Sequence, residues 1–274
     1  MKQSATDAPG RLAQVNDTSL YYERAGAGET LVLVHGGGGD RRYWDGQFAE
    51  MARDFDVVRY DLRGYGKSSA AVEGQPYRHE DDLAGLLDSL GIDQAHIAGF
   101  SLGCQIVVDT YTVYPERFRS LIAVGPYVSG HVSAAATRLF DEYGQCGAAF
   151  AESGSRGAAE RFVNMPAFNP ERIDPAVRER ILAIASDHSW WWANHHDPMQ
   201  TVVPVATEKL ADLAVPVLIV SAQYDVDVCR EVADLLEANT ATGVRVDIPG
   251  ASHFMLMENP VEFNRALRGF LRGD

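Results

Sequence analysis

Short apolar runs alternate with amphipathic stretches along most of the chain. Leu31–Val34 is a continuous apolar run, as expected of a strand buried on both faces of a sheet. Leu83, Leu86, Leu87 and Leu90 instead recur at helical spacing. This alternation predicts right-handed βαβ units and therefore an α/β fold with a mostly parallel sheet covered by helices on both faces.

The predicted strands and helices follow from these runs and from the turn residues that bound them. The first two strands are expected to form an antiparallel hairpin or meander. The predicted strands are Arg11–Val15, Leu20–Arg24, Leu31–Val34, Asp56–Tyr60, Ala95–Phe100, Ser120–Val124, Val215–Ser221 and Val244–Ile248. The predicted helices are Tyr43–Arg53, the Leu83–Leu90 segment, Leu102–Tyr114, Arg230–Ala238 and Val261–Leu271.

The alternation stops between about Tyr127 and Pro204. This stretch contains no strong strand pattern, only helical segments rich in alanine, arginine and aromatic residues. No internal repeat or long linker separates independent domains. We therefore expect residues 1–126 and 205–274 to form one core, and residues 127–204 to form a helical cap that lies over its sheet.

The composition and charge of the chain argue against some classes of binding partner. The 274 residues carry a net charge of −14 with 46% hydrophobic residues, so we expect a folded chain that binds neither nucleic acid nor an anionic membrane surface. No apolar stretch approaches the ~18–20 residues that cross a bilayer. The three cysteines form no CxxC pair, and the first ten residues lack an apolar signal segment, which together predict a cytoplasmic protein. The sequence does not indicate an oligomeric state.

The strongest chemical signal is Gly99-Phe100-Ser101-Leu102-Gly103, placed between a predicted strand and a predicted helix. In a GxSxG turn of this kind, the tight strand-to-helix connection lifts the serine hydroxyl clear of the sheet. The two glycines keep side chains out of the crowded turn. Ser101 is therefore the predicted nucleophile.

A serine nucleophile needs a base, and the base needs an acid that orients it. His253 follows the last predicted strand, and Asp225 follows the strand Val215–Ser221, so both lie where catalytic groups collect in parallel sheets. Asp227 is the competing acid. Asp225 is favoured because it is closer to the end of the strand, and it gives the chain order Ser101, Asp225, His253.

A second constellation is His35-Gly36-Gly37-Gly38-Gly39, at the end of an apolar strand. Acyl transfer needs backbone N–H groups that point at a developing oxyanion, and glycine lets the backbone approach closely. The predicted donors are the amides of Gly37 or Gly38 and of Leu102. The run matches no phosphate-binding pattern, and His35 is expected to be structural.

Together these motifs resemble the α/β-hydrolase superfamily, from about residue 20 to the C-terminus. The resemblance also includes the segment Asp61-x-Arg63-Gly64-x-Gly66-x-Ser68, which is structural in that family. It implies an eight-stranded, mostly parallel sheet with a helical cap between the sixth and seventh strands. The chain looks similar to the small enol-lactonases, esterases and carbon–carbon bond hydrolases of this superfamily. Serine at position 101 argues against its haloalkane dehalogenases and epoxide hydrolases, which use aspartate.

The predicted cap contributes candidates for a substrate pocket. Three adjacent tryptophans cannot all face one way on a helix, so we expect some to line a pocket and others to pack on the sheet. The candidate pocket residues are Trp190, Trp191, Trp192, His188 and Phe254. No metal is predicted, because His195-His196 matches no zinc spacing and a Ser-His-Asp set needs neither a metal nor a cofactor.

The sequence therefore predicts a serine hydrolase that cleaves a small carboxylic ester, lactone or thioester through an acyl-enzyme. One alternative on the same scaffold is a hydrolase that cleaves a C–C bond in a diketone or meta-cleavage product. The others are a non-hydrolytic, cofactor-independent relative and a ligand-binding receptor. In each case the partner is a small molecule.

Overall fold

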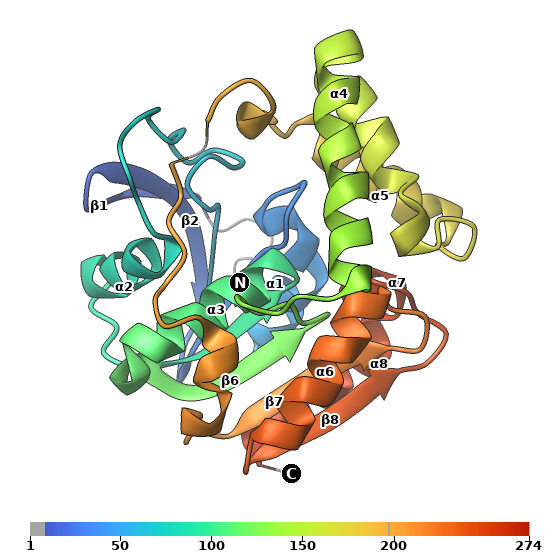
Figure 1. Cartoon of the computed structure of the whole chain (residues 1–274). Helices are drawn as coiled ribbons and strands as arrows, with labels where there is room; N and C mark the ends of the chain where they lie inside the picture. Colours follow the sequence, from blue (N-terminus) through green and yellow to red (C-terminus); the bar gives the residue numbers. More distant parts are fainter. Residues whose placement is uncertain (1–8, 197, 274) are drawn as a thin grey trace.

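Eight strands form one mixed sheet in the computed structural model, which describes residues 9–196 and 198–273. Its strand order is β1-β2-β4-β3-β5-β6-β7-β8 (Figure 1). The β1–β2 and β2–β4 pairs are antiparallel, and all later pairs are parallel. The strands are β1 (Arg11–Val15), β2 (Thr18–Gly26), β3 (Thr30–Val34), β4 (Asp56–Tyr60), β5 (Ala95–Phe100), β6 (Phe118–Val124), β7 (Val217–Ala222) and β8 (Gly243–Ile248). The predicted hairpin and the mostly parallel, eight-stranded sheet are confirmed.

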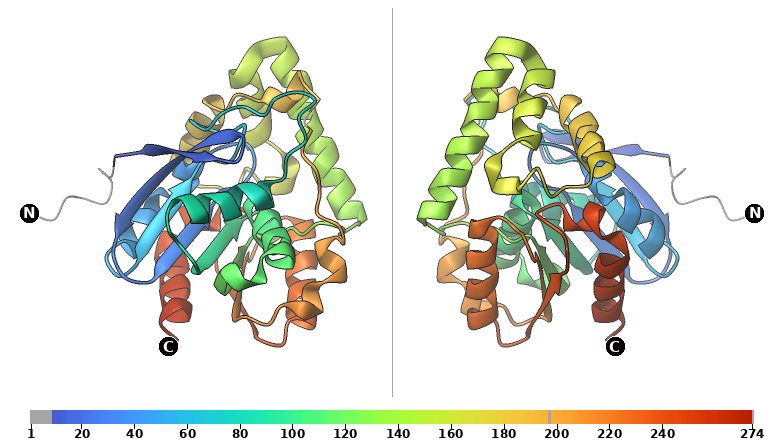
Figure 2. Two further views of the ribbon diagram at one scale, coloured as in Figure 1. Left: turned by 90° about the vertical axis from the view of Figure 1, so that its left-hand side faces the viewer. Right: turned by 90° about the vertical axis from the view of Figure 1, so that its right-hand side faces the viewer.

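Helices cover both faces of the sheet. In Figure 2, α1 and α8 lie on one face, and α2, α3 and α6 lie on the other; α1 packs against α8, and α2 against α3. The α-helices are α1 (Asp45–Met51), α2 (His79–Ser89), α3 (Leu102–Val113), α4 (Ala134–Val163), α5 (Pro175–Ser186), α6 (Asp227–Asn239), α7 (Met255–Glu258) and α8 (Pro260–Arg272). The short 3₁₀ helices are η2 (Arg41–Trp44), η3 (Pro115–Arg117), η4 (Pro166–Phe168), η5 (Trp191–Ala193), η6 (Ala206–Glu208) and η7 (Leu210–Asp212).

The central strands are apolar along their whole length because both of their faces are covered. Val32 on β3 lies beside Ile97 on β5, and Ile97 lies beside Leu121 on β6. All three side chains are fully buried. The core is continuous across the sheet, so the loops at the ends of these strands start from fixed positions.

A helical insertion lies between β6 and β7, as the sequence predicted. It rises above the sheet in Figures 1 and 2 and contains the long helix α4 and the shorter α5. Each helix has a side-chain cap at its start: Ser133 accepts a hydrogen bond from Ala136 N, and Asp174 accepts one from Ala176 N. Gly154, with φ 65° and ψ −163°, introduces a kink within α4.

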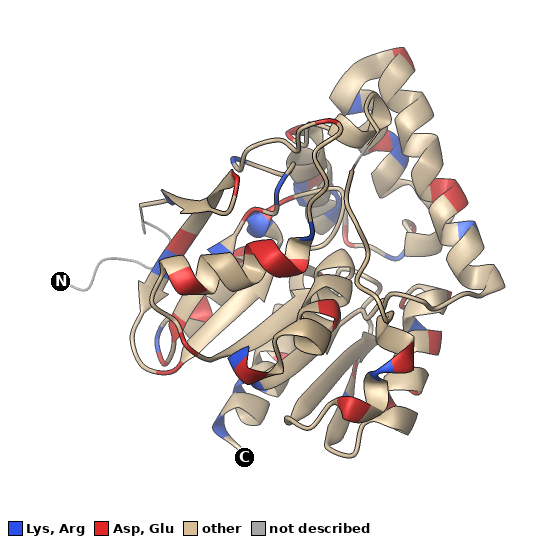
Figure 3. Ribbon diagram, turned by 60° about the vertical axis from the view of Figure 1, so that its left-hand side comes forward, with Lys and Arg blue, Asp and Glu red and all other residues tan. Residues whose placement is uncertain are grey.

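Charged residues of both signs are interspersed over the face shown in Figure 3, where acidic residues mark α2 and α6. In the described part of the chain, no helix has both the length and the apolar character that a membrane span requires.

Candidate active site

Ser101 lies in the sharp turn between β5 and α3. Its backbone has φ 54° and ψ −114°, a region that residues other than glycine rarely occupy. The turn is held because Ser101 N donates to Val124 O at 2.9 Å. A Cβ on Gly99 would lie 2.2 Å from the carbonyl oxygen of Gly103, and one on Gly103 would lie 2.3 Å from that of Val34. Both glycines are therefore required by the close approach of the backbone.

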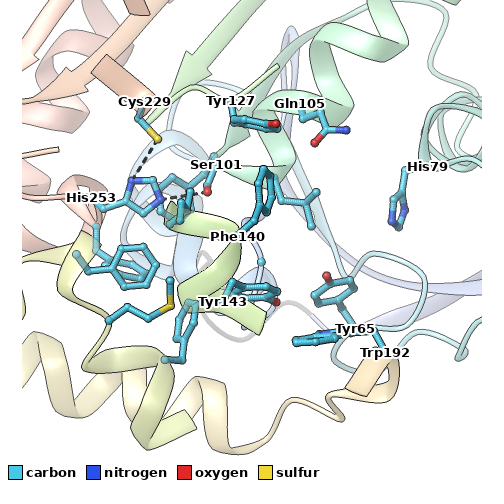
Figure 4. Close-up of a pocket in the computed structure, with 18 of the residues that line it drawn as sticks. Tyr65, His79, Ser101, Gln105, Tyr127, Phe140, Tyr143, Trp192, Cys229 and His253 are labelled. Atoms are coloured by element: carbon cyan, nitrogen blue, oxygen red, sulfur yellow. Dashed lines mark hydrogen bonds between the residues drawn. The ribbon is translucent and has the colours of Figure 1, made fainter. Parts of the chain in front are cut away.

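The structure brings the three predicted triad residues together. His253 Nε2 lies 3.1 Å from Ser101 Oγ, and His253 Nδ1 lies 2.7 Å from Asp225 Oδ1 (Figure 4 shows Ser101 and His253). Asp225 Oδ1 also accepts a hydrogen bond from Val226 N at 2.8 Å. Asp225 and His253 are buried. A hydrogen bond from Nδ1–H to the carboxylate leaves Nε2 as the acceptor that faces the serine hydroxyl.

The competing acid, Asp227, lies in a different environment. It is the first residue of α6, and its side chain is 60% exposed. Its carboxylate pairs with Arg230 at 2.6 Å and with Arg138 at 3.5 Å. The hydrogen bond to His253 is therefore made by Asp225.

Two contacts of His253 were not found from the sequence. The Phe168 ring of η4 stacks on the imidazole with a centroid separation of 5.3 Å and an interplanar angle of 3°, so the insertion directly covers the triad. Cys229 Sγ lies 3.9 Å from His253 Nδ1, and burial raises the pKa of this thiol well above its ordinary value. Asp225 lies before the start of α6 and Cys229 within it, so their spacing in the sequence gave no signal for this contact.

The glycine loop after β3 is held from behind by His35. His35 Nδ1 donates to Gly36 O at 2.8 Å, and Leu62 N donates to His35 Nε2 at 3.0 Å. Burial lowers the pKa of this imidazole and so favours its neutral form. The two hydrogen bonds satisfy both nitrogens of that form. Asp61 braces the same loop, because it accepts a hydrogen bond from the backbone N–H of Arg41 at 3.0 Å.

The candidate oxyanion donors differ in their positions. Gly37 and Leu102 line the same cavity as Ser101, whereas Gly38 is not among the described residues of its lining. Gly38 has φ +70°, and a Cβ there would lie 2.6 Å from the Phe162 ring. Leu102 is the first residue of α3, so its N–H has no acceptor within the helix.

The cavity next to Ser101 has a volume of about 250 Å³ (Figure 4). Aromatic side chains form most of its wall, and α4 and η4 contribute many of them. The described residues that line it are Gly37, Tyr65, His79, Phe100, Ser101, Leu102, Gln105, Tyr127, Leu139, Phe140, Tyr143, Phe162, Met165, Phe168, Trp192, Met199, Cys229, His253 and Phe254.

The five predicted pocket residues divide into two groups. Trp192 and Phe254 line the cavity, whereas Trp190, Trp191 and His188 lie outside its wall. Trp190 is fully buried and donates from Nε1 to Ala185 O at 3.1 Å, Trp191 stacks on His195, and His188 stacks on Tyr65. The chain is left-handed at Trp190 and then enters a 3₁₀ helix, which turns the three tryptophans in different directions.

One group of possible metal ligands occurs among the described residues. The ligand atoms of Asp225, Cys229 and His253 lie within 4.8 Å of one another. The carboxylate and the imidazole already share a hydrogen bond, and the burial that raises the pKa of Cys229 keeps its thiol protonated. Metal ligation needs the thiolate, so the arrangement fits a triad better than a metal centre.

Known proteins share both the sequence pattern and the fold. The alpha/beta hydrolase family matches residues 31–266. A protein of Azorhizobium caulinodans, provisionally named the carbamate hydrolase RutD, is 27% identical over 260 residues, which cover 94% of this chain and 97% of that protein. A 2-hydroxy-6-oxo-6-phenylhexa-2,4-dienoate hydrolase of Comamonas testosteroni is 31% identical over 118 residues, 41% of each chain. An esterase structure from Thermogutta terrifontis, 24% identical, superposes with a TM-score of 0.78 over 97% of this chain and 99% of that one.

Proposed function

The chain belongs to the alpha/beta hydrolase family, and from this premise we propose that it is a serine hydrolase that cleaves a small carboxylic ester or lactone through an acyl-enzyme. The observation that carries the proposal is the hydrogen-bonded series from Ser101 through His253 to Asp225, which lies beside a cavity with many aromatic side chains in its wall. Nucleophile, base and acid are in contact in the order that acyl transfer requires. The match to a carbamate hydrolase along nearly the whole chain supports attack on a carbonyl carbon.

The first half of the reaction forms the acyl-enzyme. Ser101 Oγ attacks the substrate carbonyl while His253 Nε2 accepts the hydroxyl proton. Asp225 stabilises the imidazolium through the 2.7 Å contact with Nδ1. The imidazolium then returns the proton from Nε2 to the departing alkoxide oxygen as the tetrahedral intermediate collapses.

The oxyanion of that intermediate needs donors that are already in place. We assign this role to the backbone N–H groups of Leu102 and of Gly37 or Gly38, with Gly37 favoured because it lines the cavity beside Ser101. The N-terminus of α3 adds its positive dipole end at the same position. In the second half of the reaction, a water molecule gives a proton to His253 Nε2 and attacks the acyl carbon. The imidazolium then returns this proton to Ser101 Oγ as the ester bond to the enzyme breaks, which releases the acid and regenerates Ser101.

A cap of residues 127–204 would control access to this site. Phe168 of that segment stacks on His253, and Leu139, Phe140 and Tyr143 of α4 line the cavity. We propose that this segment selects substrates by shape, while the sheet and its loops carry the chemistry.

C–C bond hydrolysis is the second candidate function. It is favoured by the 31% identity to the phenylhexadienoate hydrolase over 118 residues, and the same nucleophile and base would serve it. The two functions are distinguished by the products that the purified protein forms from simple esters and from an anionic dienoate of that class.

The first test is intact-protein mass spectrometry after exposure to a fluorophosphonate. We expect one adduct on the wild type and none on Ser101→Ala, because a serine is phosphonylated only when a neighbouring base activates it. Ser153→Ala, on the exposed side of α4, is the matched control and keeps the adduct. A folded wild type that forms no adduct, or a Ser101→Ala variant that still forms one, contradicts the proposal.

A further inference from the structure

The wall of the active-site cavity carries polar groups but no fixed charge. None of its described residues is Lys, Arg, Asp or Glu. A carboxylate that entered this space would lose its hydration and find no cation to replace it, which is strongly unfavourable. The described wall therefore favours an uncharged substrate, which supports the ester or lactone over the anionic dienoate of the second candidate function.

His79 stands out among the polar groups of this wall. It is the first residue of α2, only 3% exposed, and its Nδ1 is buried without a hydrogen-bond partner in the described structure. The imidazole meets the Tyr77 ring edge-on, with a centroid separation of 5.2 Å. The guanidinium of Arg63 lies over the other ring of this pair, 4.6 Å from the Tyr77 centroid. His79 is therefore held in place by its ring contacts.

Desolvation by burial, together with the nearby charge of Arg63, lowers the pKa of His79 to about 3. The imidazole is consequently neutral near pH 7 and offers one N–H donor and one acceptor nitrogen. A buried polar atom without a partner is costly, and such atoms are rare in folded proteins unless a ligand or water completes them.

Gln105 provides a second polar group in the same wall. It lies one helical turn after Ser101 on α3, and its Nε2 donates to Asp109 Oδ2 at 3.4 Å. Because this contact fixes the orientation of the Gln105 amide, its Oε1 remains free to accept a hydrogen bond from a ligand. In the view of Figure 4, Gln105 and His79 lie on the side of the cavity away from His253 and Cys229.

We infer that His79 and Gln105 form a subsite for a hydroxyl group on an uncharged substrate, at a distance from the bond that Ser101 attacks. A hydroxyl is both a donor and an acceptor, so it can donate to Gln105 Oε1 or pair with the neutral His79 ring, both of which belong to the cavity wall. The aromatic side chains between the subsite and Ser101 then cover the apolar part of the molecule. This inference rests on the proposed hydrolase function.

The test uses three ethyl esters whose acyl chains end, at the same position, in a hydroxyl, a methyl or a carboxylate group. We expect the wild type to favour the hydroxyl ester over the methyl ester by roughly 3- to 10-fold in kcat/KM, the size of one neutral hydrogen bond. The carboxylate ester should be the poorest substrate. His79→Leu should remove the hydroxyl preference, so that the ratio of kcat/KM for the hydroxyl and methyl esters, both measured on this variant, falls to about one.

His195→Leu is the matched control, since His195 stacks on Trp191 outside the cavity wall. It should keep the hydroxyl preference. Gln105→Met provides an independent variant in case His79→Leu fails to fold, and it is expected to reduce the same preference. A wild type that favours the methyl or the carboxylate ester overturns the inference, as does a hydroxyl preference that survives both His79→Leu and Gln105→Met.

Failure of the proposed chemistry is separated from failure of the subsite by a binding measurement. In Ser101→Ala, a change in the total tryptophan fluorescence, to which Trp192 of the cavity wall contributes, reports binding of the same three esters without turnover. Tighter binding of the hydroxyl ester that is lost with His79→Leu supports the subsite, even if no ester is hydrolysed. Equal binding of the hydroxyl and methyl esters contradicts it, even if the wild type is an active esterase.

Discussion

Asp225 and Asp227 are two residues apart, yet only Asp225 faces His253. Asp225 is the third residue after β7, where the chain is still turning back over the sheet, and its Oδ1 lies 2.7 Å from His253 Nδ1. Asp227 has already entered α6, where its carboxylate faces Arg230 and Arg138. Charge alone does not separate the two residues. The two residues differ in their positions relative to the end of β7, and these positions decide which one faces His253.

The two aspartates therefore give a matched pair of variants. Asp225→Asn should lower kcat by about 10⁴-fold, because an amide that donates to Nδ1 selects the wrong imidazole tautomer and no longer stabilises the imidazolium. Asp227→Asn should change kcat by less than about twofold, since it removes only exposed ion pairs. Steady-state hydrolysis of the best ester substrate measures both effects. The assignment of the acid is wrong if the two results are exchanged.

The three residues that meet at this site could be selected from the sequence because each lies shortly after a predicted strand: Ser101 directly follows β5, Asp225 is the third residue after β7 and His253 is the fifth after β8. The wall of the pocket could not be predicted in this way, because it depends on contacts between segments that are distant in the sequence. Phe168 stacks on His253, a residue 85 positions later in the sequence, and no periodic pattern links the two. Trp190 and Trp192 look equivalent in the sequence, but the left-handed backbone at Trp190 buries one ring and brings the other to the cavity.

The strand–turn–helix element around Ser101 depends on tight backbone packing. A methyl group on Gly103 would lie 2.3 Å from the Val34 oxygen, whereas one on Gly144 of α4 would meet nothing within 4 Å. Gly103→Ala should therefore lower the free energy of unfolding by about 1–3 kcal/mol and also displace Ser101. Gly144→Ala should raise it by roughly 0.5–1 kcal/mol, because alanine is the better helix former.

Urea unfolding of the two glycine variants, together with fluorophosphonate labelling, checks this prediction. Gly103→Ala should label more slowly than the wild type, and Gly144→Ala should label at the wild-type rate. Equal changes in stability would show that backbone crowding does not hold the turn.

Elements bounded by clear apolar runs were predicted closely, and elements defined by packing were not. β5 has the predicted bounds Ala95–Phe100, because the run is continuous and a turn follows it. The predicted helix Arg230–Ala238 actually begins at Asp227 and includes the buried Val228 and Cys229, because two apolar residues are too few to show the helical period. Within the insertion, the sequence indicated helices but not the kink in α4, which lies at Gly154, where φ is 65°.

Two buried carboxyl groups lie where the core meets the insertion. Glu80 of α2 and Asp109 of α3 are 4% and 1% exposed, and Asp109 accepts a hydrogen bond from Ser129 Oγ, in the segment that leads into α4. Desolvation by burial raises the pKa of Glu80 to about 7 and that of Asp109 to about 6. In a chain of net charge −14, neither group has a cation within hydrogen-bonding distance among the described residues.

These groups make the stability of the whole molecule depend on pH. An acid whose pKa is higher in the folded state than in the unfolded state holds its proton more tightly when folded, so stability falls as the pH rises between the two values. For Glu80 this interval runs from the ordinary value of 4.5 to about 7, and the contribution is constant above it. Glu80→Gln removes the titrating group while it keeps a similar shape.

We therefore expect the wild type to lose stability relative to Glu80→Gln as the pH rises from about 4.5 to about 7, by up to about 1.4 kcal/mol per pH unit. Urea unfolding at half-unit pH intervals measures the difference between the two proteins. Glu179→Gln, at an exposed position on α5, is the control, and its difference from the wild type should stay flat over the same interval. A Glu80→Gln difference that is also flat, or that shrinks as the pH rises, would mean that Glu80 is not held protonated by burial at the junction of core and insertion.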